Sequence, residues 1–462
     1  PGETVSAELE LTTDSLTPWD VDAPQVYDVH LRLSQGGALH DVVTVRFGHR
    51  SLEFREREGL FLNGRRLPLR GVNRHESMPG FGSALPLALH RADARLIKDM
   101  GLNFVRLSHY PQHPEFLDAC DELGILVYAE LASWKSVGGG RWLRSAQRQL
   151  SRMIYRDRNR PSVLMWGLGN EGRSLPVYQR LRAVARRLDP TRDISYAENH
   201  LYRARRKRTL GLPDVWGMNY EFDVLDEAVD SSRLRNVLVT ECSNSPDTRR
   251  GDRALEREQV VKLEKDLAVI ESRSDIAGFA LWCFNDYATM RKERYRRFSG
   301  VVDAWRQPKM SAHYLQARYL SRPVLHLYAD WSRSGQVDVR EVVVISNCNT
   351  LRVSVGDDTQ EIVPGGPMHS FAIPFADKPL RVEGSGPHGE CSAELMPYGK
   401  AHAVELSIED QAHEGSASAE WKILNVAVVD EAGHLVTHWS GDITIQVTGP
   451  ASLHSYSMHD EV

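Results

Sequence analysis

The sequence is poor in cysteine and has no long hydrophobic run. Its five cysteines include no Cys-x-x-Cys pair, which argues against a disulfide framework or a zinc site and fits a reducing compartment. No apolar stretch approaches the roughly 18 residues of a membrane span. The formal net charge of −5 gives no strong excess of either sign, so composition does not point to nucleic acid or membrane as a partner. The cysteines are Cys120, Cys242, Cys283, Cys348 and Cys391.

Motifs of several common enzyme classes are also missing. There is no Gly-rich phosphate turn, no His-Glu-x-x-His, and no Ser-His-Asp order with a nucleophile on a sharp turn. The 462 residues are 41% hydrophobic and 26% charged, an ordinary globular composition. This length predicts roughly two to four domains. The chain opens at Pro1 without Met or a signal peptide and stops abruptly at Val462, and we interpret it as part of a longer protein.

Between about residue 60 and residue 320, short β-rich runs alternate with amphipathic helices. The helices have clear boundaries, as where Pro114 begins and Gly124 ends one apolar-periodic segment. Eight βα units in this length predict an α/β fold of the (β/α)8 TIM-barrel type, with a doubly wound open sheet as the alternative. The predicted strands are 69–76, 103–110, 125–131, 162–171, 194–198, 214–220, 236–242 and 278–286.

The regions on either side of this barrel have the pattern of β-sandwiches. Residues 1–50 alternate polar and apolar side chains and predict part of an immunoglobulin-like β-sandwich, followed by the barrel domain over 51–320. Helical periodicity then disappears. Residues 321–398 predict an immunoglobulin-like β-sandwich, and residues 399–462 predict a second C-terminal β-sandwich that the chain end truncates.

In a barrel of this kind the active site lies at the C-terminal ends of the strands. Here Glu171 ends the fourth predicted strand and Glu241 the seventh, and we expect the two strands to face each other across the barrel. Two carboxylates with amide and aromatic neighbours are what glycoside hydrolysis requires. One protonates the leaving oxygen, and the other attacks the anomeric carbon or activates water. The strand ends carry Asn73, His75, Glu76, His109, Tyr110, Glu130, Asn170, Glu171, Glu198, Asn219, Tyr220, Glu241, Trp282, Asn285 and Asp286.

A structural role is the alternative for each of these residues. A glutamate at a strand end is often the salt-bridge partner of a helix arginine, and we assign Glu130 and Glu198 to such supporting roles. For Glu171, the adjacent Asn170 and the second carboxylate at Glu241 favour chemistry instead. The structural alternative also stays open for His75, His109 and Trp282.

Five segments taken together resemble glycoside hydrolase family 2, the family of the large bacterial β-galactosidases and of β-glucuronidases. They are FLNGRRLPLRGVNRHE, NFVRLSHYPQHPEFLDACDELGILVYAE, RDRNRPSVLMWGLGNE, VLVTEC and GFALWCFND. The resemblance covers the whole predicted barrel, and the flanking sandwiches match the family's layout. It implies a TIM-barrel glycosidase with a retaining mechanism, with Glu171 as general acid/base and Glu241 as nucleophile.

The same resemblance implies roles for the neighbouring side chains. Tyr220 would hydrogen-bond the nucleophile, and Asn170 would hold the sugar 2-hydroxyl, a contact that strengthens in the transition state. Glu171 must be protonated near neutral pH, which burial or the nearby negative charge of Glu241 would favour. The residues expected to line the sugar pocket are His75, His109 and Trp282.

The sequence also departs from the family pattern. The large β-galactosidases bind magnesium through a Glu and a His after the third strand, where this chain has Trp134 and Ser136, so we predict no such metal site and no cofactor. The Asn-x-Lys with which β-glucuronidases grip a carboxylate is missing near RRFSGVV. Cys242 replaces the tyrosine that follows the nucleophile in relatives. The N-terminal jelly-roll domain of the family is not present in this sequence.

The leading hypothesis is an exo-acting retaining β-glycosidase with a β-galactoside as substrate. A β-uronidase acting on galacturonides or glucuronides is an alternative, in which Arg249, Arg250 and the 291–297 cluster hold the acid. A non-catalytic carbohydrate-binding protein and a structural or adhesion protein are further alternatives. We expect a glycoside, oligosaccharide or polysaccharide as partner, and neither nucleic acid nor membrane. Homo-oligomerisation and the compartment, cytoplasm or periplasm, stay open.

Overall fold

The computed structural model describes Glu8, Glu10 and residues 15–229, 236–291, 294–333, 338–409, 423–437 and 439–449. Parts of the two terminal sandwiches predicted above, including residues 410–422 and 450–462, lie outside these ranges. The chain divides into two compact units. The first comprises Pro1–Gly71, Asn103–Thr240 and Ile270–Ala280, and the second comprises Val72–Leu102, Glu241–Val269 and Leu281–Val462.

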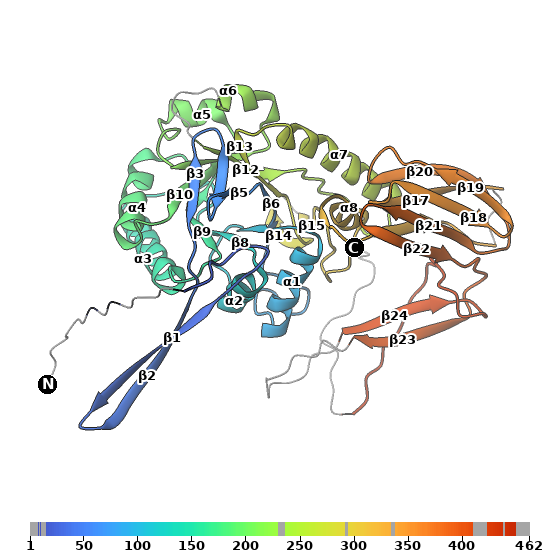
Figure 1. Ribbon diagram of the computed structural model, residues 1–462, viewed down its shortest axis with the longest axis horizontal. Coiled ribbons are helices and arrows are strands. Elements are labelled where there is room, and N and C mark those ends of the chain that lie inside the picture. Colours follow the sequence, from blue (N-terminus) through green and yellow to red (C-terminus); the bar gives the residue numbers. More distant parts are fainter. Residues whose placement is uncertain are drawn as a thin grey trace. The chain divides into compact units, whose positions relative to one another are not determined.

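Eight strands form a closed barrel, which confirms the predicted α/β barrel fold (Figure 1). Neighbours in the barrel are also neighbours along the chain, as expected for repeated βα units. Nearly every strand residue is buried, and burial on both faces explains why the strands are continuous apolar runs. The strands are β6 (Leu69–Arg74), β7 (Phe104–Leu107), β8 (Leu126–Glu130), β9 (Val163–Asn170), β10 (Asp193–Glu198), β11 (Val215–Asn219), β12 (Val237–Cys242) and β13 (Ile276–Leu281).

The strand order corrects one expectation. We expected the strands that carry Glu171 and Glu241 to face each other across the barrel. The order places β10 and β11 between β9 and β12, and the strand four positions from β9 is β13. Since opposite strands of an eight-stranded barrel are four positions apart, the expectation of directly facing strands was wrong.

The helices follow the strands along the chain. Helix α2 shows why the sequence signals worked, because Pro114 is its first residue and the His113 side chain accepts from the Glu115 backbone N–H. Gly124 then closes α2 in the left-handed region at φ 73°, where a Cβ would lie 2.2 Å from the Val21 carbonyl oxygen. The helices are α1 (Leu87–Asp99), α2 (Pro114–Leu123), α3 (Gly140–Asp157), α4 (Leu175–Leu188), α5 (Leu201–Arg206), α6 (Leu225–Val229), α7 (Arg253–Glu271) and α8 (Met310–Tyr319), with the short 3-10 helix η1 (Phe222–Val224).

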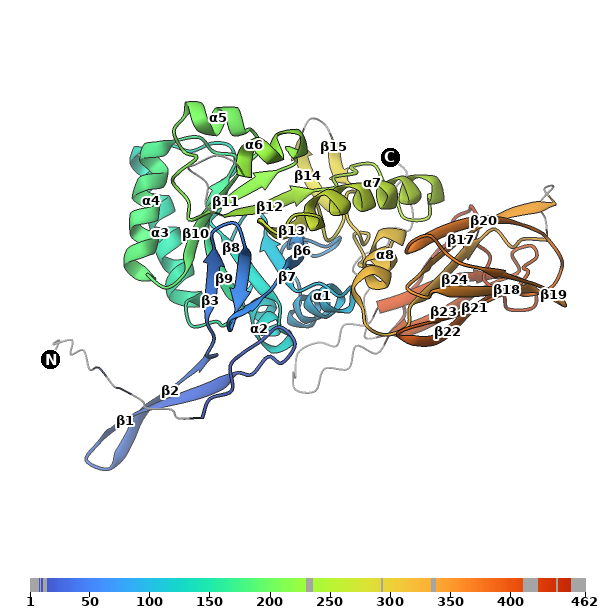
Figure 2. The ribbon, with the colours of Figure 1, turned by 45° about the horizontal axis from the view of Figure 1, so that its top comes forward.

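Helices α3 and α4 show how the outer layer covers the barrel strands. They lie side by side outside β9 and β10 (Figure 2). Each buries one apolar side, with Leu143, Leu150 and Ile154 on α3 and Leu181 and Val184 on α4. None of the helices in the described part of the chain is long and apolar enough to cross a membrane.

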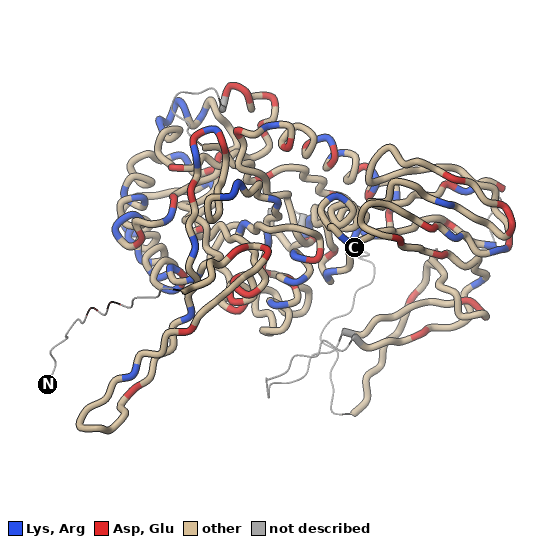
Figure 3. Tube along the Cα trace, in the orientation of Figure 1, with Lys and Arg blue, Asp and Glu red and all other residues tan. Residues whose placement is uncertain are grey.

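The segment before the barrel contains a long antiparallel hairpin. It consists of β1 (Tyr27–Gln35) and β2 (Ala38–Phe47), which pair with each other only in a two-stranded sheet. Few charged residues lie toward its tip (Figure 3), where Leu31, Leu33 and Leu39 are exposed. A smaller antiparallel sheet follows, made of β3 (Leu52–Arg55), β4 (Gly59–Leu62) and β5 (Arg65–Arg66). The assignment of residues 1–50 to part of a sandwich domain stays a prediction.

The segment after α8 forms two antiparallel sheets that share one apolar core. Trp331, Val342 and Val344 lie on or just after strands of the first sheet. They pack in the same cluster as Leu351 and Val382 of the second sheet. Cys348 and Cys391 lie in this region as free thiols with their Sγ atoms 3.5 Å apart. The strands of the first sheet are β16 (Leu325–Ala329), β17 (Val339–Ser346) and β20 (Met368–Pro374), and those of the second are β18 (Thr350–Val355), β19 (Asp358–Ile362), β21 (Leu380–Gly386) and β22 (Gly389–Leu395).

Two further hairpins complete the described structure. The first directly follows the last barrel strand and consists of β14 (Tyr287–Arg291) and β15 (Arg294–Arg297), with Tyr287 paired to Arg297. The second consists of β23 (Ala403–Glu409) and β24 (Ile423–Val429).

Candidate active site

The end of β9 turns sharply so that Glu171 leaves the strand as a buried carboxylate. Gly169 has φ 140°, and a Cβ there would lie 2.8 Å from the Ser133 side chain. Glu171 itself has φ 53°, in the left-handed region that non-glycine residues rarely adopt. Its backbone N–H donates to the Ala197 carbonyl at 2.7 Å, which fixes the turn to β10. The Glu171 side chain is buried in this arrangement, with a relative exposure of 7%.

A buried arginine organises the neighbouring strand ends. Arg106 on β7 is fully buried, and its Nε donates to Glu130 Oε2 at 2.8 Å. Its Nη2 donates to Asn170 Oδ1 at 2.9 Å, and its Nη1 donates to the Thr240 carbonyl at 3.2 Å. One guanidinium therefore ties the ends of β8, β9 and β12 together, using the multiple donors that only arginine offers.

Glu130 is the counter-ion of this network. Burial opposes its charge, but Arg106 and His109 together hold the pKa of Glu130 below its usual value. His109 Nδ1 lies 2.9 Å from Glu130 Oε1, so the carboxylate also fixes the orientation of that imidazole. These contacts place Glu130 in a supporting position, where it orients Arg106 and His109.

A chain of amides leads from this network to Glu171. Thr240 Oγ1 donates to Asn219 Oδ1 at 2.8 Å, which directs the Asn219 Nδ2 toward Asn170 Oδ1 at 3.0 Å and Glu171 Oε1 at 3.4 Å. Asn170 Oδ1 thus accepts from Asn219 and from Arg106. Its own Nδ2 is buried and has no hydrogen-bond partner among the described residues, so it is an oriented donor available to a bound group.

Glu198 is held in a similar way. It ends β10, fully buried, and Arg173 Nη2 lies 2.7 Å from its Oε1. Burial raises the pKa of Glu198, and the charge of Arg173 only partly offsets this effect. Glu198 is therefore held by Arg173 and the Asn199 N–H, and its contacts are those of a structural carboxylate.

The second unit carries an aromatic group and the second candidate carboxylate. Glu241 lies on β12 and is buried. The His75 ring lies 4.2 Å from the Tyr287 ring and 5.4 Å from the Trp282 ring, centroid to centroid, and Trp282 Nε1 donates to the Tyr287 hydroxyl at 3.2 Å. Burial raises the pKa of Tyr287, and the negative charge of Glu241 contributes to the shift.

The structure thus arranges the predicted site residues in two groups. Asn170, Glu171 and His109 are joined through Arg106 and Asn219 in the first unit. In the second unit, His75 and Trp282 are joined through Tyr287, and Glu241 lies on β12.

Tyr220 lies next to the first group of site residues. It directly follows β11 and Asn219, at φ 63°. Its backbone carbonyl accepts from the Phe222 N–H at 2.8 Å. The predicted hydrogen bond from Tyr220 to Glu241 stays a prediction.

Sequence reasoning missed three side chains of these groups. Arg106 had a signal, because an arginine inside the apolar strand FVRL needs a buried carboxylate partner. Tyr287 is on the hairpin after the last barrel strand, and no periodic pattern marks it. Lys135, on the loop after β8, lies with its Nζ 3.3 Å from Glu171 Oε2. Only the folded loop reveals that contact, because the two residues are far apart in sequence.

The loop after β8 corresponds to the stretch where the resemblance to the large β-galactosidases would imply a magnesium site and where we predicted none. Trp134 and Ser136 occupy the matching positions, and both side chains are exposed. Neither an indole nor a hydroxyl replaces a carboxylate or imidazole as a strong ligand for that ion. Within the described residues, no group of three or more His, Cys, Asp or Glu side chains is arranged to hold a metal ion. The residues present therefore do not fit the metal site of those relatives.

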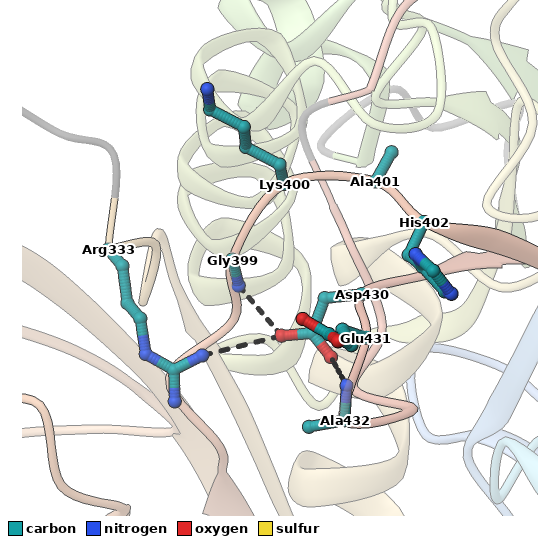
Figure 4. Close-up of a pocket in the computed structure, with 8 residues that line it drawn as sticks. All are labelled: Arg333, Gly399, Lys400, Ala401, His402, Asp430, Glu431 and Ala432. Atoms are coloured by element: carbon teal, nitrogen blue, oxygen red, sulfur yellow. Dashed lines mark hydrogen bonds and ion pairs between the residues drawn. The ribbon is translucent and has the colours of Figure 1, made fainter.

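A separate pocket of about 470 Å³ lies beside the hairpin of β23 and β24 (Figure 4). Its central carboxylate, Asp430, accepts from the backbone N–H groups of Gly399 and Ala432 and from Arg333. The Gly399 N–H is the main cause that holds the pKa of Asp430 below its usual value. These bonds use Asp430 to hold two turns together, so we assign this pocket a structural role.

Residues 53–240 match the profile of the glycosyl hydrolases family 2 TIM barrel domain. The match spans β6 to β12 and ends one residue before Glu241. The chain belongs to glycosyl hydrolase family 2. This finding confirms the resemblance drawn from the sequence. A family 2 barrel carries its polar and charged side chains at the C-terminal strand ends, where both groups described above lie.

Relatives in family 2 include enzymes named for two different sugars. The chain is 31% identical to a β-galactosidase of Thermoanaerobacterium thermosulfurigenes, over 74% of this chain and 49% of the relative. It is 28% identical to a β-galactosidase of Thermoanaerobacter pseudethanolicus, over 96% of this chain and 63% of the relative. A β-glucuronidase of Bacteroides fragilis is 34% identical over 43% of this chain and 30% of the relative. The chain spans less than two thirds of the length of each of these relatives.

Solved structures agree with the family assignment. A β-glucuronidase of Parabacteroides merdae superposes with a TM-score of 0.70 at 27% identity, covering 91% of this chain and 59% of that one. A β-glucuronidase of Bacteroides uniformis gives a TM-score of 0.75 at 25% identity, covering 83% and 53%. The family 2 fold is therefore clear, and the sugar for which these proteins are named is galactose in some and glucuronate in others.

Proposed function

We propose that the protein is a retaining exo-β-glycosidase of family 2 that hydrolyses terminal β-linked sugars, with β-galactosides as the leading substrates. The observation that carries the proposal is the Glu171 side chain. It is buried at a barrel strand end, beside the Asn170 amide whose Nδ2 is an oriented, unused donor. A buried carboxylate with a fixed polar donor next to it is what acid/base catalysis on a sugar needs.

In the first step, protonated Glu171 gives its proton to the glycosidic oxygen while the Glu241 carboxylate attacks the anomeric carbon. The bond from the anomeric carbon to the leaving oxygen breaks, and the alcohol departs carrying the proton. The sugar is left as an ester of Glu241. In the second step, ionised Glu171 takes a proton from water as the water oxygen attacks the anomeric carbon and frees Glu241. Two inversions give net retention at that carbon.

The side chains around the two carboxylates would hold the sugar during these steps. Asn170 Nδ2 is proposed to donate to the sugar 2-hydroxyl, because Arg106 and Asn219 fix the other end of its amide. The aromatic group is proposed to pack on the sugar ring and exclude water. Its members are His75, Trp282 and Tyr287, and His109 and Tyr220 complete the proposed sugar-binding set.

The first test is a turnover screen with nitrophenyl β-galactoside, β-glucoside, β-mannoside, β-glucuronide and β-galacturonide. Wild type should turn over at least one of them, and Glu241→Ala should lower that rate by several orders of magnitude, because the nucleophile is lost. Sugar binding should survive in the variant. A substrate that binds but turns over in neither protein would instead favour the carbohydrate-binding alternative.

A β-uronidase is the second candidate, and Arg297 is the observation that favours it. Arg297 pairs with Tyr287 across the β14–β15 hairpin, and its charge acts on the Tyr287 hydroxyl. A guanidinium beside the aromatic group could pair with a sugar carboxylate. The other two arginines named for this role are engaged elsewhere, since Arg249 lies over the Phe298 ring and Arg250 donates to the Pro308 carbonyl.

The substitution Arg297→Met distinguishes a uronide substrate from a neutral galactoside substrate. If the substrate is a uronide, kcat/KM should fall by about tenfold or more, the size expected for losing a charge-assisted hydrogen bond. Turnover of a neutral galactoside should change far less. Arg296→Met is the matched control, because Arg296 is the neighbouring position, exposed and opposite Ala288. Equal losses for both sugars would remove the reason to consider a uronide.

A further inference from the structure

The loop after β8 places a cation and an exposed aromatic ring directly beside Glu171. Lys135 Nζ lies 3.3 Å from Glu171 Oε2 and 4.8 Å from the centroid of the Trp134 ring. Both side chains face solvent, with Trp134 45% exposed and the Lys135 side chain 39% exposed. Glu171 itself is almost completely buried, so this pair marks the solvent side of the carboxylate.

The backbone holds the pair in place. Trp134 forms a parallel bridge with Asn170, and the Lys135 N–H donates to the Asn170 carbonyl at 2.8 Å. Asn170 returns a hydrogen bond, from its own N–H to the Ser133 carbonyl at 2.7 Å. Lys135 has φ 60°, a conformation that a non-glycine residue adopts only where its surroundings impose it. The loop is therefore fastened to the residue that precedes Glu171.

The pair does not have the contacts of a purely structural ion pair. Arg106 and Glu130 are both fully buried, whereas in this pair only the carboxylate is buried and the Lys135 side chain is 39% exposed. An ammonium has three N–H donors, and its contact with Glu171 Oε2 is an ion pair that leaves this buried oxygen without a hydrogen bond from the described residues. An exposed indole next to an exposed ammonium is a surface suited to a flat ring that carries a negative charge.

We propose that Trp134 and Lys135 form the binding site for the leaving group, and that the preferred leaving group is an anionic ring. This inference rests on the proposed function, because Glu171 as general acid must contact the glycosidic oxygen and so borders the leaving group. The indole stacks on the ring, and the ammonium pairs with its carboxylate or sulfate. An acidic sugar and a carboxylated phenol share this chemistry. The site does not concern the sugar whose anomeric carbon reacts.

A leaving group with its own negative charge competes with Glu171 for the Lys135 ammonium. Lys135 is therefore the residue through which the charge of the leaving group is proposed to be recognised.

The test compares two pairs of β-galactosides that differ only in charge on the leaving group. The first pair is 4-carboxyphenyl galactoside and its methyl ester. The second is lactose and the disaccharide in which glucuronate replaces the reducing glucose. If β-uronides prove to be the reacting sugars, the same leaving groups are placed on that sugar. The variants are Lys135→Met and, as the matched control, Lys207→Met, an exposed lysine after α5.

Lys135→Met should lower kcat/KM for the charged member of each pair about tenfold more than for the neutral member, the size of a partly exposed charge-assisted contact. The extra loss should shrink in 0.5 M salt because screening weakens exposed pairs. Lys207→Met should change neither ratio. A loss confined to the aryl pair identifies a carboxylated phenol, and a loss confined to the disaccharide pair identifies an acidic sugar. Trp134→Ala should raise KM for both members of a pair, because the stacking contact is lost.

The failures of the two proposals look different. Equal losses for charged and neutral substrates in Lys135→Met, with a shifted pH profile, would mean that Lys135 acts only on Glu171, and would overturn the leaving-group site. No turnover of any glycoside would overturn the proposed function. Titration calorimetry of 4-carboxyphenyl galactoside into Glu241→Gln, with and without Lys135→Met, then decides the charge contact by binding alone. Equal affinities in those two proteins would overturn it.

Discussion

The polar network around Glu171 and the ring cluster of the second unit differ in kind. Around Glu171, hydrogen bonds and ion pairs link Arg106, Glu130 and Asn219 to the strand end. The second unit, which carries Glu241, holds a cluster of rings in which His75 packs on Tyr287 and Trp282. The first group fixes directions, because each buried donor must meet one acceptor. The second fixes shape and excludes water, because stacked rings tolerate small displacements.

The largest expected effect distinguishes the role of Glu171 from that of Glu241, because it depends on the leaving group of the substrate. Glu171→Ala should lower kcat for a methyl β-glycoside by a factor on the order of 10²–10⁴, the usual contribution of a general acid. A 2,4-dinitrophenyl glycoside needs no proton to depart, so its bond cleavage should suffer much less. Glu241→Ala should abolish turnover of both substrates to the same extent. If Glu171→Ala lost both equally, the assignment of the acid role to Glu171 would be wrong.

The next effect concerns stability at the polar side. Arg106→Met leaves the fully buried Glu130 without its guanidinium and should lower the free energy of unfolding by about 3–5 kcal/mol. The matched control is Arg257→Met, which breaks the partly exposed pair with Glu341 and should cost less than about 1 kcal/mol. Chemical denaturation measures both.

The double variant Arg106→Met/Glu130→Leu sharpens this test. It removes the buried charge together with its partner, so it should be more stable than Arg106→Met alone. A double variant that is less stable than the single one would show that Glu130 contributes through contacts other than its pair with Arg106.

Histidines give a comparison within the second unit. His313 and His326 stack with ring centroids 3.7 Å apart. Burial lowers the pKa of His313 to about 3 and that of His326 to about 4, from an ordinary value of 6.5. Because both folded values lie below the unfolded one, their contribution to stability is complete above about pH 6.5. It is lost as the pH falls from there toward 4, where the unfolded chain binds protons that the folded chain does not.

His326→Phe keeps a stacked ring but removes one of these titrations. The free energy of unfolding should therefore depend less steeply on pH between 4.5 and 6.5 than in wild type, by up to about 1.4 kcal/mol per pH unit. Between pH 7 and 8, where both imidazoles are neutral in both states, the two proteins should have the same slope, which is the internal control. Parallel curves over the acid range would contradict the prediction.

The smallest expected effect is on the aromatic side. Tyr287→Phe removes the acceptor of the Trp282 Nε1 hydrogen bond but keeps the ring that packs on His75. We expect a loss of about 1 kcal/mol in the free energy of unfolding and a modest rise in KM. Tyr287→Ala also removes the packing on His75 and should lower the free energy of unfolding distinctly more. If Tyr287→Phe were as damaging as Arg106→Met, the contrast between the two neighbourhoods would fail.

Much of the fold could be predicted because its signals are local. Proline at the start and glycine at the end of α2, and the apolar runs of the eight strands, depend on backbone conformations that a few neighbouring residues decide. The positions of Glu171 and Glu241 at strand ends followed from the same runs. The spatial relation of the two strands was predicted wrongly. Strand order in the closed barrel decides which strands face each other, and β9 and β12 are three positions apart and not four.

The sequence by itself determined the barrel, its strand ends and the pair of candidate carboxylates, because short-range periodicity and turn chemistry specify them. Only the tertiary structure decided what surrounds those carboxylates. Arg106 binds partners 24, 64 and 134 residues away, and Lys135 reaches Glu171 from a different loop. Such contacts depend on closure of the barrel, which brings together strand ends that are distant in sequence. No local pattern contains that information, because each partner alone looks like an ordinary charged residue.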